Sequence, residues 1–469
     1  MLISLQGVLY IFTYKKDLTE DEIIAHGRNL EGKTLKDIGE EVSVNHWLGK
    51  TANKGAIGNA IQVCYFGIPA NSIKEADFNF HHLELKVTPI KKNKNNTYSS
   101  KERLVLSIIN YQMDWQYDFE ISPLYNKSNQ MLLVFYLHEQ NKEAKDYKIL
   151  KVEKFKIPVE DLPTIIEDYQ IIIDKIKAGK AHQISESDTT YLAASTKGAG
   201  KGKDWRIQPF SKDRAKQRAF SFKGSYMTSY FNSVYNTEHL EKIPVPKQLS
   251  LPDYLNQAFA PYIGLDIKQI EERLNYHPRK ELSEDKSYLQ RLVSQILGIP
   301  NTNLNNIEQF QKANIKFKTI RLREKNNQDM SFPNINFHEI LKINFEDSTW
   351  YEWLAETKYL FVVFEDTPSG TFLKKQLFWN LPYEQLQELE KLYNHIKEQL
   401  QEGAIEVNII KNNSGKEIWK NNLPKKGFVP NFQIRPKGNK ESKFTTLPDG
   451  RKFKKMCLFL NKEYLHKTI

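Results

Sequence analysis

The chain has 469 residues, enough for roughly two to four domains with a buried core. Hydrophobic residues make up 40% of it and aromatic residues 12%, which excludes a wholly disordered or collagen-like chain. Lysine and arginine number 68 against 57 aspartates and glutamates, and this net charge of +11 favours a polyanionic partner. Two cysteines, Cys64 and Cys457, fit a reducing compartment and exclude a disulfide framework or a cysteine-rich zinc site.

The N-terminal run Met1–Thr13 is apolar, but it lacks a basic segment and a small-residue cleavage site. It is also too short to span a bilayer, so we expect a strand or a packed arm. Since no other stretch approaches the length of a membrane span, we expect a soluble, cytoplasmic protein that does not contact membranes.

Positive charge is concentrated in two segments. Residues 411–469 hold fifteen lysines and arginines against four acids, an excess of +11, and residues 190–223 hold nine against two, an excess of +7. Aromatic residues such as Trp205 and Phe444 are interleaved with both. Clustered basic and aromatic side chains are typical of nucleic-acid binding, although a solvated basic face on an ordinary enzyme has the same composition.

Several stretches recur in the same order in the two halves of the chain, which predicts two copies of one domain. The pairs are Tyr65–Asn71 and Ile296–Thr302, Leu83–Thr88 and Ile315–Ile320, Met131–Tyr136 and Tyr359–Phe364, Asp161–Ala178 and Tyr383–Gln401, and Thr196–Ala199 and Gln433–Gly438. Pro244, Pro246 and Pro252 mark the linker between the copies. Each copy mixes apolar, β-branched strands such as Met131–Leu137 with amphipathic helices such as Leu162–Ile176.

The segment Asp77–Thr88 carries the candidate chemistry. Apolar residues alternate with Glu84 and Lys86, and the two-residue period of a strand places these two side chains on one face. Asp77 lies far enough upstream for a turn to return its carboxylate to that face. Two carboxylates can hold Mg²⁺, and a lysine can orient the attacking water, as in the Asp…Glu-x-Lys pattern of the PD-(D/E)-x-K nucleases. A solvent-facing salt-bridge ladder on an edge strand would show the same spacing.

His81 and His82 precede this strand. A zinc site would need more ligands at defined spacing, so we interpret both as residues at the entry of the strand.

Lys54–Gly67 (KGAIGNAIQVCYFG), Asp77 and Glu84–Pro89 (ELKVTP) resemble the catalytic core of the MutH family. This family comprises a mismatch-repair nicking enzyme and type II restriction endonucleases of the Sau3AI type that cut at GATC. Further stretches favour the restriction branch, namely Tyr98–Leu106, Ile109–Tyr111, Thr196–Ala199, Ala215–Ser221 and Tyr226–Thr228. The clear match covers about residues 20–235, and the long second half fits the restriction branch, whose members resemble two fused MutH-like domains.

The resemblance implies that Asp77 and Glu84 bind Mg²⁺ and that Lys86 is the catalytic lysine. Lys127 matches a further active-site lysine, and the uncharged Gln62 stands where the family has a carboxylate, which leaves the number of metal ions open. The implied DNA contacts are Lys54, Lys101, Arg103, Lys197, Arg206, Lys216 and Arg218 in the first copy and Arg435 and Lys437 in the second. Candidates for reading bases rather than touching phosphate are Lys197, Arg206, Arg214, Lys216 and Arg218.

The second copy differs at the candidate site. Lys316 (or Ile315) and Lys318 stand at the positions of Glu84 and Lys86, and the position of Asp77 falls near Gln309. Without carboxylates this copy should not bind a catalytic metal, yet its basic end is retained. This combination predicts a regulatory domain that binds DNA.

The sequence therefore predicts an α/β protein with the PD-(D/E)-x-K restriction-endonuclease-like fold, a mixed central sheet flanked by helices, duplicated as two MutH-like domains. We expect a catalytic domain at 1–235, a linker at 236–254 and an inactive DNA-binding domain at 255–469. The predicted function is Mg²⁺-dependent cleavage of both strands of DNA at GATC, leaving 5′-phosphates. We expect a monomer that assembles as a dimer on DNA, with the second domain binding another DNA site as an allosteric effector. A MutH-like nicking repair enzyme and a non-enzymatic DNA-binding protein with a decayed site remain as alternatives.

Overall fold

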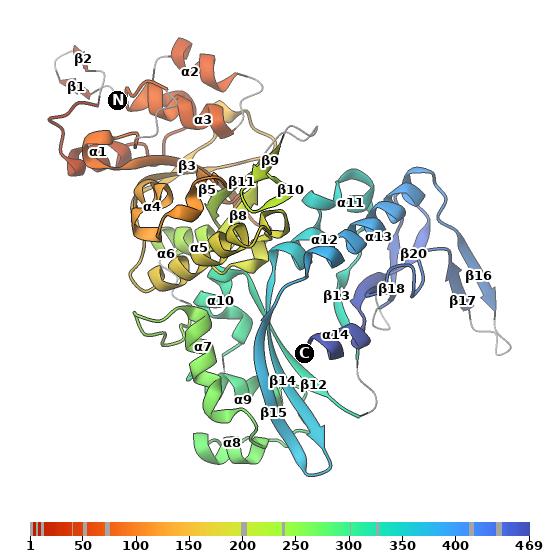
Figure 1. The fold of residues 1–469 in the computed structure, drawn as a ribbon. Coiled ribbons are helices and arrows are strands. Elements are labelled where there is room, and N and C mark those ends of the chain that lie inside the picture. Colours follow the sequence, from red (N-terminus) through yellow and green to blue (C-terminus); the bar gives the residue numbers. More distant parts are fainter. Residues whose placement is uncertain are drawn as a thin grey trace. The chain divides into compact units, whose positions relative to one another are not determined.

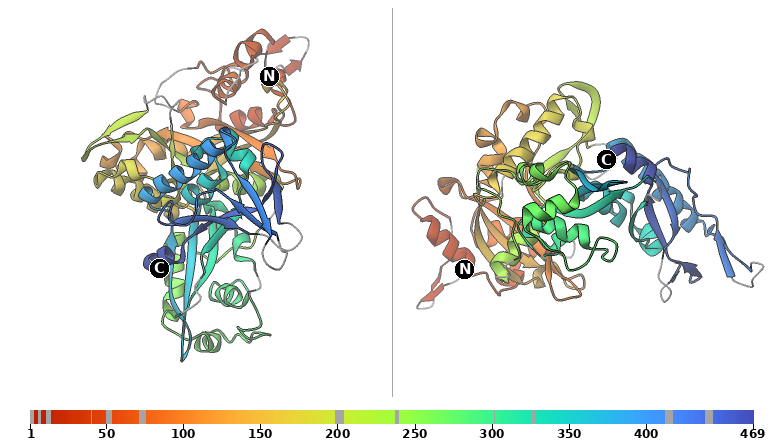
Figure 2. Two further views of the ribbon diagram at one scale, coloured as in Figure 1. Left: turned by 90° about the vertical axis from the view of Figure 1, so that its right-hand side faces the viewer. Right: turned by 90° about the horizontal axis from the view of Figure 1, so that it is seen from below.

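The computed structural model describes residues 3–5, 8–10, 14–39, 41–49, 54–70, 76–197, 204–236, 240–300, 302–324, 328–411, 417–437 and 443–469. These residues form a mixture of helices and strands (Figures 1 and 2), which confirms the predicted α/β class. The chain divides into two compact units. The first comprises residues 1–184, 188–255 and 305–314, and the second comprises residues 185–187, 256–304 and 315–469.

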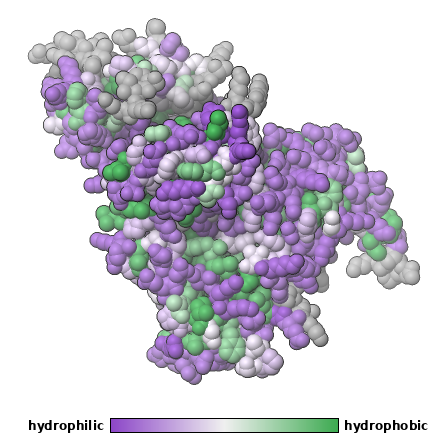
Figure 3. All heavy atoms as spheres, in the orientation of Figure 1, coloured by the Kyte–Doolittle hydropathy of each residue, from purple (hydrophilic) through white to green (hydrophobic). Residues whose placement is uncertain are grey.

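The N-terminal run contains an antiparallel pair, β1 (Ile3–Leu5) and β2 (Val8–Tyr10). This pair confirms the expected strand, and the rest of residues 1–13 lies outside the described part of the chain. Among the described helices, none is both long and apolar enough to cross a membrane. The face shown in Figure 3 is mostly hydrophilic, with smaller hydrophobic areas between the polar side chains.

The central sheet of the first unit has the strand order β4-β3-β6-β7. Its strands are β3 (Glu84–Lys92), β4 (Tyr98–Ser100), β6 (Gln130–Leu137) and β7 (Ile149–Lys156). β3 runs parallel to β6, whereas β7 pairs antiparallel with β6. All side chains from Met131 to Tyr136 are buried, as expected for a strand covered on both faces.

Helices cover both faces of this sheet. Leu132, Val134 and Tyr136 of β6 pack in one cluster with α1 (Glu20–Arg28), α2 (Glu41–Leu48) and α3 (Lys54–Ala60). On the other face the ring of Phe135 lies 5.0 Å from that of Phe231 in α6 (Gly224–Tyr235). The alternation along β6 follows from the two-residue period of a strand.

A second sheet of the first unit has the order β5-β11-β8 and is antiparallel throughout. Its strands are β5 (Leu104–Ile108), β8 (Leu192–Thr196) and β11 (Arg218–Phe222). An antiparallel pair, β9 (Trp205–Gln208) and β10 (Ser211–Lys216), precedes β11 in the chain. The short α4 (Pro123–Ser128) follows β5.

The predicted helix at Leu162–Ile176 is α5 (Leu162–Lys177). Its face toward the core buries Tyr169, Ile165, Ile172, Ile173 and Ile176, whereas Ile166, also expected there, is only half-buried. The same face buries Asp168, which the apolar pattern did not indicate. Its carboxylate accepts hydrogen bonds from the backbone N–H groups of Thr190, Tyr191 and Leu192, at 2.5–2.9 Å. Asp168 thereby fixes the start of β8 against α5.

The second unit repeats the order of strand types. β12 (Ile315–Leu322) runs parallel to β14 (Lys358–Thr367), which pairs antiparallel with β15 (Gly370–Trp379). A second sheet has the order β13-β21-β18 and is antiparallel, with β13 (Met330–Asn334), β18 (Phe432–Pro436) and β21 (Met456–Leu460). The predicted helix at Tyr383–Gln401 is α13, with the same bounds, and it buries Leu389, Leu392, Tyr393 and Ile396.

Smaller elements complete this half of the chain. The helices are α7 (Leu251–Phe259), α8 (Ile267–Leu274), α9 (Tyr288–Ile296), α10 (Glu308–Ala313), α11 (Phe337–Lys342), α12 (Thr349–Tyr351) and α14 (Lys462–Thr468). Two hairpins are formed by β16 (Val407–Lys411) with β17 (Glu417–Asn421) and by β19 (Phe444–Thr446) with β20 (Lys452–Lys454).

One helix from the second half of the sequence belongs to the first unit. Lys312 of α10 is buried, and its ammonium lies 2.9 Å from Asp161 and 3.0 Å from Glu308. By their contacts, residues 236–255 and 305–314 therefore belong to the first compact unit. The predicted division is one of function rather than of packing. It places a catalytic domain at 1–235, a linker at 236–254 and a DNA-binding domain at 255–469, and it stays a prediction.

Candidate active site

A tight turn delivers Asp77 to the start of β3. Phe78 and Leu83 form an antiparallel bridge, and between them lie the 3₁₀ turn η3 (Asn79–His81) and His82 in the left-handed conformation, φ 51°. The Asp77 carboxylate accepts a hydrogen bond from Leu85 N–H at 3.0 Å. The turn therefore does what the spacing predicts, and it brings Asp77 beside Glu84.

Glu84 is 6% exposed, so it does not belong to a solvent-facing ladder. Its Oε1 accepts a hydrogen bond from the Lys86 ammonium at 2.8 Å. Its Oε2 is buried and has no hydrogen-bond partner within the described part of the chain. A buried acceptor left without a partner costs about 1–3 kcal/mol, and more when it is charged. This oxygen is therefore a position where a cation would be bound favourably.

The charge of Asp77 responds to the same arrangement. Burial, and secondly repulsion from Glu84, raise the pKa of Asp77 to about 6, against the hydrogen bond from Leu85 and the charges of Lys86 and Lys127. A carboxylate whose ionisation is hindered by a neighbouring carboxylate is a typical consequence of placing the two around one point. A divalent cation between them would remove the repulsion, and carboxylate oxygens are the ligands that hard cations prefer.

These side chains line one open cavity of about 590 Å³ in the first unit. Asp77, Glu84, Lys86 and Gln62 all border it, together with glycines of α3 and with Glu102, Lys197 and Asn59. At Gly58 an added Cβ would meet nothing within 4 Å, so the surface of α3 is bare where it borders the cavity. The cavity can therefore admit a phosphate group of a polymer from outside.

Gln62 lies in a π-helical turn, η2 (Ile61–Tyr65), that continues α3. Its side-chain N–H donates to the carbonyl oxygen of Pro69 at 3.4 Å. This contact uses the nitrogen and orients the amide, while the oxygen is a neutral acceptor that brings no charge to the cavity. Single π-helical turns within helices are frequent at functional sites.

Lys127 belongs to α4 and lines a neighbouring, larger cavity of about 1,090 Å³ rather than the cavity of Asp77. Its positive charge nevertheless lowers the pKa of Asp77, so it acts on the same site through its field. The structure thus brings four of the five predicted catalytic residues to one cavity, while the fifth, Lys127, lines the larger cavity.

The predicted DNA-binding residues of the first unit fall into different environments. Lys197 lines the cavity of Asp77, while Arg206 and Arg214 are exposed and line the larger cavity together with Trp205 and Ile207. Lys101 is exposed and its ammonium lies 3.1 Å from the His138 ring, and Arg103 and Lys216 are half-buried. The side chain of Lys54, at the start of α3, lies outside the described part of the structure.

Arg218 is buried within the sheet, and its guanidinium donates to the carbonyl oxygen of Ala194 at 2.7 Å. This environment favours a structural role, and the DNA contact expected of Arg218 stays a prediction. In the second unit, Arg435 and Lys437 are exposed and lie over the Phe459 ring, with the Arg435 guanidinium 3.9 Å from its centre.

Glu102 and Asn59 are the cavity residues that the motif did not single out. Glu102 lies in the middle of the β4–β5 connection, between Lys101 and Arg103 and within the stretch Tyr98–Leu106 that resembles the restriction branch. Among the described residues, no group of three or more histidine, cysteine, aspartate or glutamate side chains is placed to hold a metal ion. His81 accordingly interacts with the carbonyl oxygen of Leu18 at 2.7 Å, as a residue at the strand entry.

Comparisons with known proteins identify the family of this chain. The family model described as DNA mismatch repair enzyme MutH matches residues 66–168, which include Asp77, Glu84 and Lys86. The type II restriction enzyme Sau3AI of Staphylococcus aureus is 31% identical over 447 residues, covering 90% of this chain and 88% of the relative. With an identity of this extent, the chain belongs to the MutH and Sau3AI family and is a type II site-specific deoxyribonuclease.

Proposed function

We propose that the first unit is a Mg²⁺-dependent nuclease that cuts both strands of DNA at GATC and leaves 5′-phosphates. The observation that carries the metal requirement is the buried Glu84 Oε2 without a partner, placed beside an Asp77 whose pKa is raised to about 6. Both features fit a hard divalent cation bound by the two carboxylates. The GATC site rests on the resemblance to restriction enzymes of the Sau3AI type.

The residues around Asp77 and Glu84 have different roles in catalysis. When bound, Mg²⁺ supplies polarisation of the phosphate and acidifies a water molecule. Lys86 lies beside Glu84 in the same cavity, so its ammonium can orient the attacking water and stabilise negative charge that develops on the phosphate. Lys127, which lines the larger cavity, adds positive charge that acts on Asp77, and Gln62 offers a neutral amide oxygen.

We further propose that the two units are copies of one PD-(D/E)-x-K fold. Both have a parallel strand pair followed by an antiparallel strand, and both have a second antiparallel sheet in which the last strand in sequence lies in the middle. Glu84 and Lys86 pair with the second and fourth residues of β6, and Lys316 and Lys318 pair with the second and fourth residues of β14. This register makes Lys316 and Lys318 the counterparts of Glu84 and Lys86.

The counterpart of the nuclease site therefore has the lysine Lys316 in place of the carboxylate Glu84 and keeps a lysine, Lys318, at the position of Lys86. Gln309, expected near the position of Asp77, instead exchanges hydrogen bonds with the backbone of Ile243 in the first unit. We propose that the second unit binds no catalytic metal and binds a second DNA site as an allosteric effector. The enzyme would be a monomer that pairs on DNA, since symmetric cutting of two strands needs two active sites.

Digestion of a supercoiled plasmid with and without Mg²⁺ tests this proposal. Linear fragments that require Mg²⁺ support it, nicked circles would favour a repair-type nicking enzyme, and unchanged plasmid would indicate a decayed site. Plasmids with one and two GATC sites test the effector role. A two-site substrate should be cut roughly 5–150-fold faster, the usual range for coupling between sites, and equal rates would contradict the effector role.

A further inference from the structure

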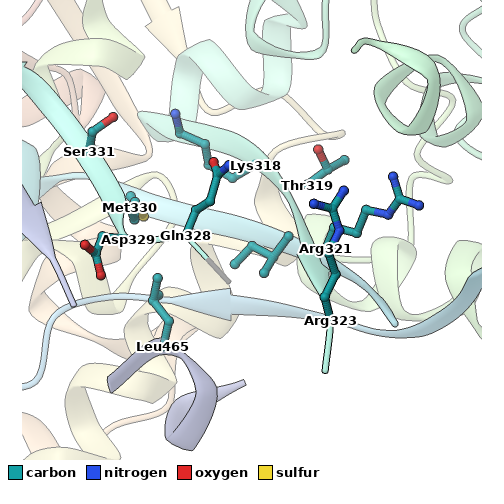
Figure 4. A pocket seen from close by; sticks show the side chains of 10 residues that line it. Lys318, Thr319, Arg321, Arg323, Gln328, Asp329, Met330, Ser331 and Leu465 are labelled. Atoms are coloured by element: carbon teal, nitrogen blue, oxygen red, sulfur yellow. The ribbon is translucent and has the colours of Figure 1, made fainter. Parts of the chain in front are cut away.

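The second unit has a cavity of about 310 Å³ at the β12 and β13 strands (Figure 4). Lys318, Thr319, Arg321 and Arg323 line it from β12 and its end, and Asp329 and Ser331 line it from the other side. We propose that this cavity binds a backbone phosphate of duplex DNA, with Lys318 as the principal ligand, and that DNA binding there needs no divalent cation. The inference rests on the proposed role of the second unit as a DNA-binding domain.

The place of the cavity in the fold is the first argument. Lys318 pairs with Phe361 in β14 as Lys86 pairs with Leu133 in β6, and each lysine borders a cavity. In the first unit the corresponding cavity is the proposed site of the scissile phosphate. A duplex that docks on the second unit in the same way would bring a phosphate to Lys318.

The charge of the cavity is the second argument. Among the described residues, Lys318, Arg321, Arg323 and Asp329 are the charged side chains that line it. The charges of Lys316 and Lys437 act on Lys318, Arg435 pairs with Asp329, and Asp366 pairs with Arg321 and Arg323. Both carboxylates are engaged by arginines, Asp329 by Arg435 at 2.9 Å and Asp366 by Arg321 at 2.7 Å. The charge that remains around Lys318 is positive and suits an anion.

The lysines also repel each other. Burial of the ammonium group, followed by the charges of Lys437 and Lys316, lowers the pKa of Lys318. A phosphate between these lysines would relieve the repulsion, just as a cation would relieve that between Asp77 and Glu84. Hydroxyl donors are at hand, because Ser331 Oγ lies 2.5 Å from the Lys437 ammonium and Thr319 also lines the cavity.

The two cavities carry opposite charge, and this contrast is the reason why we expect phosphate to bind the second cavity without a divalent cation. Asp77 and Glu84 repel a phosphate until a cation neutralises them, whereas the ammonium groups of Lys316 and Lys318 attract it directly. One chain would then hold two phosphate sites of opposite charge. The first would be filled only with metal, and the second would be filled with or without it.

Fluorescence anisotropy with the full-length protein and a labelled GATC duplex in EDTA tests this inference. The variants are Lys318→Gln and Lys318→Arg, with Lys342→Gln, an exposed lysine at the end of α11, as the charge-matched control. Lys318→Gln should bind about ten-fold more weakly, as expected for one lost hydrogen bond between charged groups. For Lys318→Gln, the slope of the logarithm of the binding constant against the logarithm of the salt concentration should be less steep by about 1, because one phosphate fewer is neutralised.

Lys318→Arg should restore binding, Lys342→Gln should bind like wild type, and thermal unfolding midpoints establish that all variants are folded. If Lys318→Gln binds the duplex in EDTA with the same affinity and the same salt dependence as the wild type, Lys318 is not a phosphate ligand. This result would overturn the phosphate site but not the proposal that the second unit binds a second DNA site. Wild-type protein that binds no duplex in EDTA would overturn the cation-independent site, and equal cleavage of one-site and two-site plasmids would separately overturn the effector role.

Discussion

Replacing Asp77 by asparagine should stabilise the metal-free protein while abolishing cleavage. The folded state raises the pKa of Asp77 from 3.8 to about 6, mainly by burial and secondly by repulsion from Glu84. Since one pKa unit is worth about 1.36 kcal/mol, ionised Asp77 costs the folded state up to about 3 kcal/mol. Asparagine removes the charge and keeps an oxygen that can accept the hydrogen bond from Leu85.

The sign of the pH dependence follows from linkage. Between pH 3.8 and about 6 the folded state binds more protons at Asp77 than the unfolded state does, so this group lowers stability as the pH rises. The cost is complete above the folded-state pKa and absent below the unfolded-state value. The gain from Asp77→Asn should therefore be largest at pH 8 and vanish near pH 4.

Thermal unfolding in EDTA at pH 8 and pH 4 measures the effect. A gain of 2–3 kcal/mol corresponds to roughly 5–10 °C in the unfolding midpoint of a domain of this size. Asp37→Asn provides a control of opposite sign, because a hydrogen bond from the Thr34 hydroxyl lowers the pKa of Asp37. Mg²⁺ should raise the midpoint of the wild type and leave that of Asp77→Asn nearly unchanged. An Asp77→Asn protein that is less stable than wild type at pH 8, or equally stabilised at both pH values, would refute the reasoning.

Three further substitutions test other parts of the site. Lys86→Ala should lower plasmid cleavage to below a few per cent of the wild-type rate while duplex binding persists, and retained cleavage would remove Lys86 from the catalytic set. Gln62→Glu should cut at a lower Mg²⁺ concentration than wild type, because it adds an anion to the cavity, and a folded but inactive variant would reveal a separate role for the amide. Arg218→Ala should lower the unfolding midpoint by leaving the Ala194 carbonyl without its donor, whereas Arg206→Ala should weaken DNA binding at an unchanged midpoint. The reverse pattern for the two arginines would exchange their roles.

The sequence predicted the local features well because they depend on short-range periodicity. The two-residue alternation around Glu84 and Lys86 set their common face, and the helical spacing set α5 and α13 nearly to the residue. The turn after Asp77 was predicted from the distance along the chain alone. Each of these features involves residues close in sequence, where backbone geometry leaves few choices.

Features that depend on distant packing were not predicted. The sequence predicts Arg218 as a DNA contact but does not predict its burial, which arises because it opens a strand that lies between β5 and β8, where every residue is buried. Asp168 lies on the apolar face of α5 because it binds backbone groups of the segment that leads into β8. Glu102 lines the cavity because the β4–β5 connection passes beside it. In each case the decisive partner is far away in the sequence, and composition contains no information about it.

The opposite charges of the two cavities would order the events on DNA. A cation-independent second site would hold the duplex before metal binds, and tethering then raises the effective concentration of DNA at the first site. The repulsion between Asp77 and Glu84 would delay occupation of that site by phosphate until Mg²⁺ arrives. DNA binding at the second unit would thus need no metal, whereas cleavage at the first unit would need it. The enzyme could therefore remain bound to DNA without cutting it. The presence of Lys316 at the position that corresponds to Glu84, with Lys318 at the position of Lys86, would then be a gain of anion binding rather than a mere loss of catalysis.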